Sequence, residues 1–197
     1  MQAQVFRVPM ASPDDISGVV ELIDSGRCRA EDVVCIMGKT EGNGCVNDFA
    51  RGFSNFVLAD YFGRCLGISR EETGERIALI MSGGTEGVMS PHFTVFAKAP
   101  EGEGNGEKRL AMASGHTRDF LPEEMGRMAQ VRETVAVVRR LMGEAGIEGV
   151  EDLHFVQVKT PLISTDQAEA AARRGKTVCS DNTYKSMGYS RAASALG

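Results

Sequence analysis

EDVVCIMGKT, at residues 31–40, is followed 120 residues later by a second version of itself, EDLHFVQVKT, at residues 151–160. The middle of the first version, 33–37, is a continuous apolar run, which is typical of a strand buried on both faces. Each version ends on a lysine and a threonine, Lys39-Thr40 and Lys159-Thr160. Packing alone does not require a lysine at the end of a buried strand, so the repetition indicates a shared role.

The correspondence extends outward from these ten residues. Gly26 aligns with Gly146 at the same offset of 120. An insert then moves the offset to 140, which aligns Phe49-Ala50-Arg51 and Ser54 with Tyr189-Ser190-Arg191 and Ser194. Self-similarity at a fixed offset indicates a duplicated structural unit. We place the first unit at 1–103 and the second, which is incomplete at its C-terminal end, at 104–197.

Strand-like and helical periodicities alternate along the chain, which predicts an α/β (α+β) fold of small sheets with helices. Strands are expected at 4–9, 33–37, 77–81, 94–97, 109–114 and 153–158. Helices are expected at about 13–24, 46–66, 121–145 and 164–174, with a further short helix after Ser69. The polar, glycine-rich segment 100–107 is the best linker.

Local signals predict how several helices begin and end. Ser12-Pro13-Asp14-Asp15 combines an N-cap hydroxyl with a proline at the first helical position, and Gly26 suits a left-handed helix end. The stretch 69–72 reads as a capping box. The helix over 46–66 is expected to bury four apolar side chains, namely Phe49, Phe53, Phe56 and Val57.

Composition excludes several classes of protein. The 197 residues carry a net charge of −5 with 25% charged and 42% hydrophobic residues, which is typical of a globular protein. No stretch reaches the roughly 20 apolar residues of a membrane span, and no signal peptide is evident, so we expect a cytoplasmic protein without a membrane partner. The absence of tryptophan and of basic clusters argues against a nucleic-acid partner. Five cysteines without CxxC spacing favour a reducing compartment and no metal site.

Two expected strands end in side chains suited to nucleophilic catalysis. Lys39 ends one strand, and Ser82-Gly83-Gly84 follows another directly. A desolvated lysine can lose its proton and then accept the proton of a serine hydroxyl, while glycine amides can approach and stabilise an oxyanion. Arg51 and Arg191, one from each unit, offer planar paired donors to ring carbonyls or an anion. From the residues alone, Lys39 and Ser82 are the candidate catalytic pair.

Simpler interpretations compete with this one. Gly38-Lys39-Thr40 suggests a phosphate loop, but that motif needs a glycine five positions before Gly38, where this chain has Val33. The Ser-Gly-Gly stretch is by itself also compatible with an ordinary tight turn. The three histidines, His92, His116 and His154, show no metal-ligand spacing.

Four stretches of this sequence resemble the cyanuric acid hydrolase and barbiturase family of ring-opening amidohydrolases. They are MGKTEGNGCVND at 37–48, MSGGTEG at 81–87, TRDFLPEE at 117–124 and SMGYSR at 186–191. The resemblance runs along the whole chain. It implies three homologous units around a pseudo-threefold axis, each a small sheet with helices outside, that enclose a central pocket. Two of these three units are expected here, the second incomplete.

The resemblance also implies roles for individual residues. In the family each unit gives one lysine, one arginine and one serine to the pocket, and the second unit's dyad performs the chemistry. Lys159 then corresponds to the general base, whose serine lies past residue 197. Arg51, Ser82, Gly83 and Arg191 correspond to substrate-binding positions, and Lys39 to the partner of Ser82 in a dyad that binds without attacking. This interpretation differs from the one based on the residues alone.

The implied reaction is hydrolytic opening of a cyclic amide, which converts cyanuric acid to carboxybiuret and then to biuret and carbon dioxide. Barbiturase activity is the first alternative, and a non-catalytic module that binds small anions is the second. No cofactor is expected for the chemistry, and the family's structural divalent cation belongs to the third unit. The expected partners are a small cyclic imide and further copies of the protein, as a homo-oligomer that is a tetramer in the family. Without the second-unit serine and the third unit, this chain alone is expected to be inactive.

Overall fold

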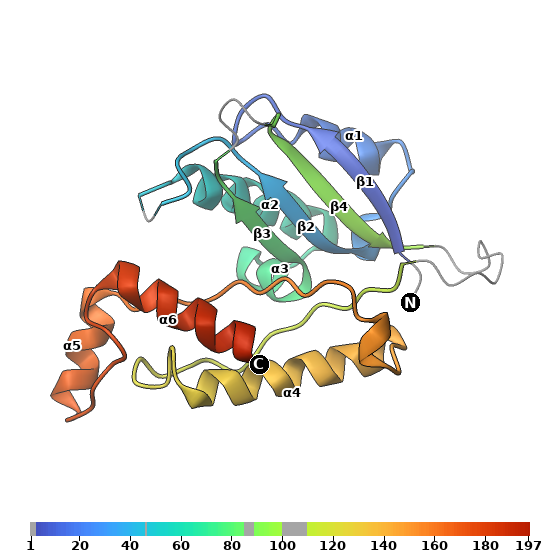
Figure 1. Cartoon of the computed structure of the whole chain (residues 1–197). Helices are drawn as coiled ribbons and strands as arrows, with labels where there is room; N and C mark the ends of the chain where they lie inside the picture. Colours follow the sequence, from blue (N-terminus) through green and yellow to red (C-terminus); the bar gives the residue numbers. More distant parts are fainter. Residues whose placement is uncertain (1–2, 46, 85–88, 100–109) are drawn as a thin grey trace. The chain divides into compact units, whose positions relative to one another are not determined.

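The computed structural model describes residues 3–45, 47–84, 89–99 and 110–197 (Figure 1). The chain forms two compact units, Met1–Ser114 and Gly115–Gly197, which we treat separately. The boundary predicted after residue 103 and the linker predicted at 100–107 lie outside the described residues. None of the described helices combines the length and apolar character that crossing a bilayer requires.

The first unit is built on a four-stranded sheet with the order β1-β4-β2-β3. Its strands are β1 (Ala3–Pro9), β2 (Val33–Lys39), β3 (Ala78–Ser82) and β4 (His92–Lys98). The central strand β2 runs parallel to β3 and antiparallel to β4, and β1 pairs antiparallel with β4. These strands confirm the ones predicted at 4–9, 33–37, 77–81 and 94–97.

The helices of the first unit are α1 (Ser17–Asp24), α2 (Ala50–Leu66) and α3 (Arg70–Arg76). Apolar side chains of α1 and α2 pack into the core beside the sheet, whereas α3, whose buried residue is Thr73, lies against α2. In the core, Leu58 and Phe62 of α2 are fully buried, as are Ile36 and Phe93 of the sheet. The capping box predicted at 69–72 is confirmed, because the Ser69 hydroxyl accepts from the Glu72 amide and the Glu72 carboxylate accepts from the Ser69 amide.

The predicted start of the first helix is wrong. The helix begins at Ser17 with Ile16 at its N-cap, and the Ser12 hydroxyl donates to Asp14 instead of capping. The Asp15 carboxylate accepts from the amides of Ala11 and Ser17, which closes a turn before the helix. The predicted end is confirmed, since Gly26 follows the helix with a φ of 71°.

The predicted buried face of α2 is also wrong. Phe49, Phe53 and Phe56 are 85%, 49% and 53% exposed, and Val57 is only half-buried. The helix begins at Ala50 and instead buries Ser54, Leu58, Ala59, Phe62 and Gly63. Apolar residues occupy both sides of this helix, so periodicity alone did not identify the side that faces the sheet.

The second unit contains helices but no strand among its described residues. Its helices are α4 (Met128–Ala145), α5 (Thr165–Arg173) and α6 (Thr183–Leu196). The helix predicted at 164–174 is confirmed, with Ser164 in a capping box. The helix predicted over 121–145 begins late, at Met128, because Gly126 has a φ of 69°, which interrupts a helix.

The strand predicted at 153–158 is wrong, and the one predicted at 109–114 is reduced to a single bridge residue at Ala111 within the described part, 110–114. In the first unit, β2 is held between β3 and β4, and β1 is held by β4. Strands form only against partners, and among the described residues no segment pairs with 153–158, so its strand-like composition does not produce a strand.

The duplication is visible in local geometry. Gly26 and Gly146 follow helices with φ values of 71° and 72°. A single 3₁₀ turn then precedes each version of the repeated stretch, Ala30–Asp32 in the first and Val150–Asp152 in the second. These shared features support the duplicated unit predicted from the sequence.

Candidate active site

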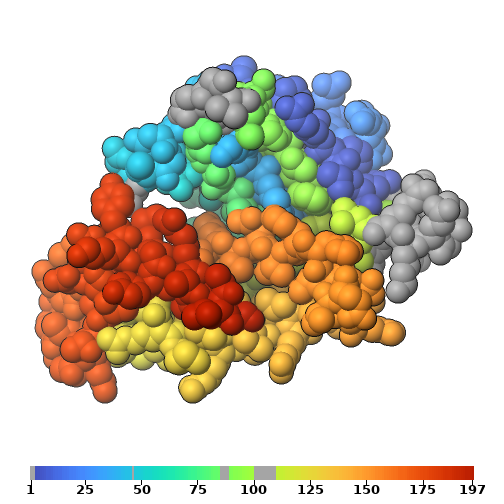
Figure 2. All heavy atoms as spheres, in the orientation of Figure 1, coloured from blue at the N-terminus to red at the C-terminus, as the bar shows by residue number. Residues whose placement is uncertain are grey.

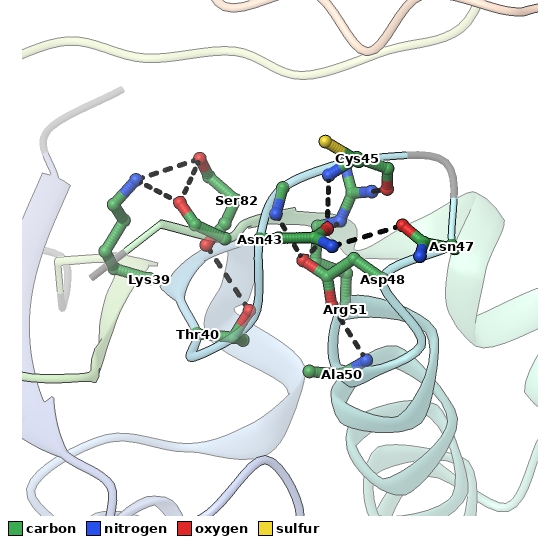
Figure 3. Close-up of polar contacts among 11 residues, drawn as sticks. Lys39, Thr40, Asn43, Cys45, Asn47, Asp48, Ala50, Arg51 and Ser82 are labelled. Carbon is green, nitrogen blue, oxygen red and sulfur yellow. Dashed lines mark hydrogen bonds and ion pairs between the residues drawn. The ribbon is translucent and has the colours of Figure 1, made fainter. Parts of the chain in front are cut away.

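Lys39 and Ser82 lie side by side because they end two parallel neighbouring strands. The register of β2 and β3 pairs these two residues directly. The Lys39 ammonium donates to the Ser82 hydroxyl at 3.2 Å and to the Gly83 carbonyl at 2.5 Å (Figure 3). Lys39 is half-buried and Ser82 is exposed. This edge of the sheet therefore presents a lysine–serine pair that a small molecule can reach.

The turn after Ser82 is tied to the loop after Lys39. Thr40 is fully buried, and its amide donates to the Ser82 carbonyl at 2.8 Å. The Gly84 amide donates to the Gly42 carbonyl, also at 2.8 Å. The threonine of the repeated Lys-Thr pair thus fixes the strand end that carries the serine.

Gly83 is buried where this turn meets the loop. A Cβ on Gly83 would lie 2.4 Å from Asp48 Oδ2 and 2.9 Å from the Gly44 nitrogen. A Cβ atom does not make contacts that short, so glycine fits at this position and a larger residue does not. Close approach of the two loops, and not the turn alone, requires the glycine.

Asp48 joins the loop to the start of α2. Its side chain is 1% exposed. The carboxylate accepts from the Gly44 amide at 2.9 Å and from the Ala50 amide at 3.0 Å. The sequence analysis gave Asp48 no role, although it ends the family-like stretch 37–48. An acid just before a helix and just after a glycine loop was the available signal.

Arg51 lies in the first turn of α2, and its side chain is 30% exposed. Its Nε atom lies 3.4 Å from Asp48 Oδ2, and Nη2 donates to the Cys45 carbonyl (Figure 3). Loop residues 41–45 themselves lie at the surface, light blue in Figure 2. One edge of the first unit therefore brings together Lys39, Ser82, Gly83 and Arg51. The arginine is held there by its ion pair with Asp48.

Lys159 and Arg191 belong to the second unit. Lys159 follows the unpaired segment 153–158, Arg191 lies on α6, and both are exposed. Among the described residues, neither side chain forms a hydrogen bond or an ion pair. Their membership of the site stays a prediction.

The helix that carries Arg191 is anchored by a buried glutamine. Gln130 of α4 is 1% exposed, and its Nε2 donates to the hydroxyls of Ser190 and Ser194, each at 2.9 Å. Its Oε1 accepts from the Gly126 amide at 2.8 Å. Ser54 and its aligned counterpart Ser194 are thus both buried, Ser54 with the Pro13 carbonyl as its partner and Ser194 with Gln130.

No cluster of three or more histidine, cysteine or acidic side chains suited to holding a metal ion occurs within the described ranges. The polar groups gathered at the edge of the first unit are an amine, a hydroxyl, a guanidinium and backbone amides. This set suits hydrogen bonding to the carbonyl oxygens of an amide or imide.

A lysine–serine pair beside a glycine turn, on a mixed α/β unit, defines a class of site suited to amide hydrolysis. The family model described as amidohydrolase ring-opening protein matches residues 4–197, and the chain belongs to this family. The sequence is 59% identical to a cyanuric acid amidohydrolase of Enterobacter cloacae, covering 100% of this chain and 54% of that protein. It is 52% identical to one from Pseudomonas sp. (strain ADP), covering 98% and 54%.

Solved structures agree with this assignment. A cyanuric acid hydrolase described as an innovation by structural concatenation has a TM-score of 0.87 and 48% identity, covering 99% of this chain and 54% of that one. A cyanuric acid hydrolase from A. caulinodans also has a TM-score of 0.87, with 47% identity, covering 98% and 53%. The predicted fold class is confirmed, and the chain spans about half the length of these relatives.

Proposed function

We propose that the protein containing this chain opens the ring of cyanuric acid by hydrolysis. The observation that carries the proposal is identity of 59% over the whole chain to a cyanuric acid amidohydrolase. The contact between Lys39 and Ser82 at an accessible sheet edge supports it, because the resemblance implies lysine–serine dyads, one that attacks and others that bind. Barbiturase activity remains the alternative within the class.

In the proposed reaction a serine hydroxyl attacks a ring carbonyl carbon while Lys159 takes its proton. The new carbon–oxygen bond forms a tetrahedral intermediate, and amide and arginine donors stabilise its oxyanion. The ring carbon–nitrogen bond then breaks, and the departing nitrogen takes a proton. Water hydrolyses the resulting ester, which restores the serine and releases carboxybiuret. Loss of carbon dioxide then yields biuret.

The first unit grips the ring in this scheme. Lys39 donates to the Ser82 oxygen, and the Ser82 hydroxyl, which donates to the Gly83 carbonyl at 3.5 Å, can turn its hydrogen to a ring oxygen instead. Arg51 adds a guanidinium, and Arg191 supplies the corresponding group from the second unit. In this proposal the Lys39–Ser82 pair binds the ring, and Lys159 is the base for the attacking serine.

The test is turnover of cyanuric acid and of barbituric acid by the complete protein and four variants. We expect turnover of cyanuric acid, loss of about a thousandfold or more in kcat for Lys159→Ala, and mainly raised KM for Ser82→Ala. Lys185→Ala, which removes another exposed lysine of the second unit, is the control and should retain full activity.

Different outcomes overturn different parts of the proposal. Turnover of barbituric acid alone selects the alternative substrate. If neither ring is opened while Lys159→Ala still binds one of them, the module that binds small anions is favoured. If the fourth variant, Lys39→Ala, abolishes kcat and Lys159→Ala does not, the attacking dyad belongs to the first unit.

A further inference from the structure

We propose that Asp48 is a positioning residue for ring binding. Its buried carboxylate holds the loop 42–44 and Arg51 against the turn at Ser82-Gly83. The inference rests on the proposed function, since it concerns the geometry of that same site. Asp48 does not face the Lys39 amine or the Ser82 hydroxyl, so it acts through its neighbours.

Both carboxylate oxygens of Asp48 are used. Oδ1 accepts from the Ala50 amide at the start of α2, and Oδ2 accepts from the Gly44 amide of the loop (Figure 3). Oδ2 also lies 3.4 Å from the Arg51 Nε. The two amides donate hydrogen bonds, one to each oxygen, whereas the buried Arg51 Nε pairs with the carboxylate by charge and has no hydrogen-bond partner among the described residues. A buried carboxylate with charged and amide donors is a strong anchor.

The Ser82-Gly83 turn is packed on this anchor. The tight space at Gly83, where a Cβ would meet Asp48 Oδ2 at 2.4 Å, shows that the carboxylate lies directly against the turn backbone. A Cβ on Gly42 would also meet Asp48, at 2.4 Å from Oδ1. Asp48 therefore contacts the loop, the turn and the arginine together.

The second copy lacks this aspartate. At the offset of 140 the second copy has Gly188 in the corresponding position, and its helix α6 is capped by Asn182 instead. An acid confined to the copy that carries the Lys39–Ser82 pair fits a role in that site better than a role in helix formation.

Asp48→Asn is the informative substitution. Asparagine keeps the shape but has one acceptor oxygen and one amide donor, so its NH₂ group must face a backbone N–H or Arg51. Asp15 offers a matched control, because its carboxylate also accepts from two backbone amides before a helix, α1, away from the Lys39–Ser82 edge. Asp48→Ser retains one acceptor and serves if the asparagine variant does not fold.

The experiment measures steady-state kinetics on cyanuric acid and amide hydrogen exchange, both on the complete protein. For Asp48→Asn we expect KM to rise about tenfold or more with kcat changed less than about threefold, and faster exchange at Gly44 and Ala50. Asp15→Asn should speed exchange only at Ala11 and Ser17 and leave KM unchanged. A purely structural loss would instead lower the active fraction and leave KM as it was.

The outcomes separate this inference from the proposed function. If the parent protein opens the ring and Asp48→Asn leaves KM unchanged, the positioning role is wrong and the function stands. Unchanged exchange at Gly44 also overturns the role. If the parent protein opens neither ring, the function fails, and exchange at Gly44 alone decides whether Asp48 orders the loop.

Discussion

Replacement of Gln130 by leucine tests how the second unit holds the helix of Arg191. Gln130 is 1% exposed and makes hydrogen bonds to Gly126, Ser190 and Ser194. Leucine fills a similar volume without polar atoms, so the change removes bonds and creates little cavity. The two serine hydroxyls lie on a helix and can turn to carbonyls one turn back, whereas the Gly126 amide loses its acceptor.

The expected cost follows from these partners. The half-buried Gly126 amide, left without an acceptor, costs about 1–3 kcal/mol. Each serine hydroxyl that exchanges Gln130 for a helix carbonyl costs about 0.5–1.5 kcal/mol. The added apolar burial offsets part of this, so we expect Gln130→Leu to lower the free energy of unfolding by about 2–4 kcal/mol.

Urea unfolding followed by far-ultraviolet circular dichroism measures this change. Lys185→Leu, at an exposed position of α6, is the control and should stay within about 0.5 kcal/mol of the parent protein. If Gln130→Leu also stays within that margin, the network does not anchor α6 and the argument is refuted.

Three further predictions use groups in both units. Ser69→Ala should cost about 1 kcal/mol in urea unfolding because it removes the cap of α3, and a change near zero would mean that the cap is not formed in solution. The paired Arg118 guanidinium lowers the pKa of Glu124 from its ordinary 4.5 to about 2. The ionised Glu124 carboxylate therefore stabilises the fold above pH 4.5, and this stabilisation is lost as the pH falls towards 2. Thermal unfolding should show this loss, and Arg118→Ala should reduce it, leaving the part due to the Leu121 amide. Burial raises the pKa of the Cys35 thiol to about 11, so a thiol reagent should modify exposed Cys65 in the native protein and Cys35 only after unfolding, as peptide mass mapping would show.

Local signals predicted the features that depend on a few adjacent residues. The capping box at Ser69 and the helix end at Gly26 are examples, because their hydrogen bonds and backbone angles are decided within four or five positions. The strands of the first unit were predicted for a related reason. A run such as 33–37, apolar on both faces, has few alternatives to a buried strand once its partners are present.

Features that depend on distant partners were missed. The segment 153–158 has strand-like composition, but no part of the chain that the structure describes pairs with it. Helix α2 has two apolar sides, and contact with the sheet determines which one is buried. Asp48 was missed because its importance arises from Gly83, which is 35 positions away in the sequence and in contact in space. Sequence patterns identified Lys39 and Ser82. The contacts of Asp48 with the adjacent loop and turn became visible only in the three-dimensional structure.

The register between β2 and β3 explains why a lysine and a serine meet at all. Parallel pairing places Lys39 opposite Ser82 at the strand ends, so the contact follows from sheet topology and not from a special loop. The second copy repeats the lysine as Lys159. If the copies share a topology, segment 153–158 pairs in the complete protein with a parallel strand whose last residue bears a hydroxyl next to Lys159. A structure of the complete protein in which 153–158 stays unpaired would show that the two lysines are related in sequence but not in function.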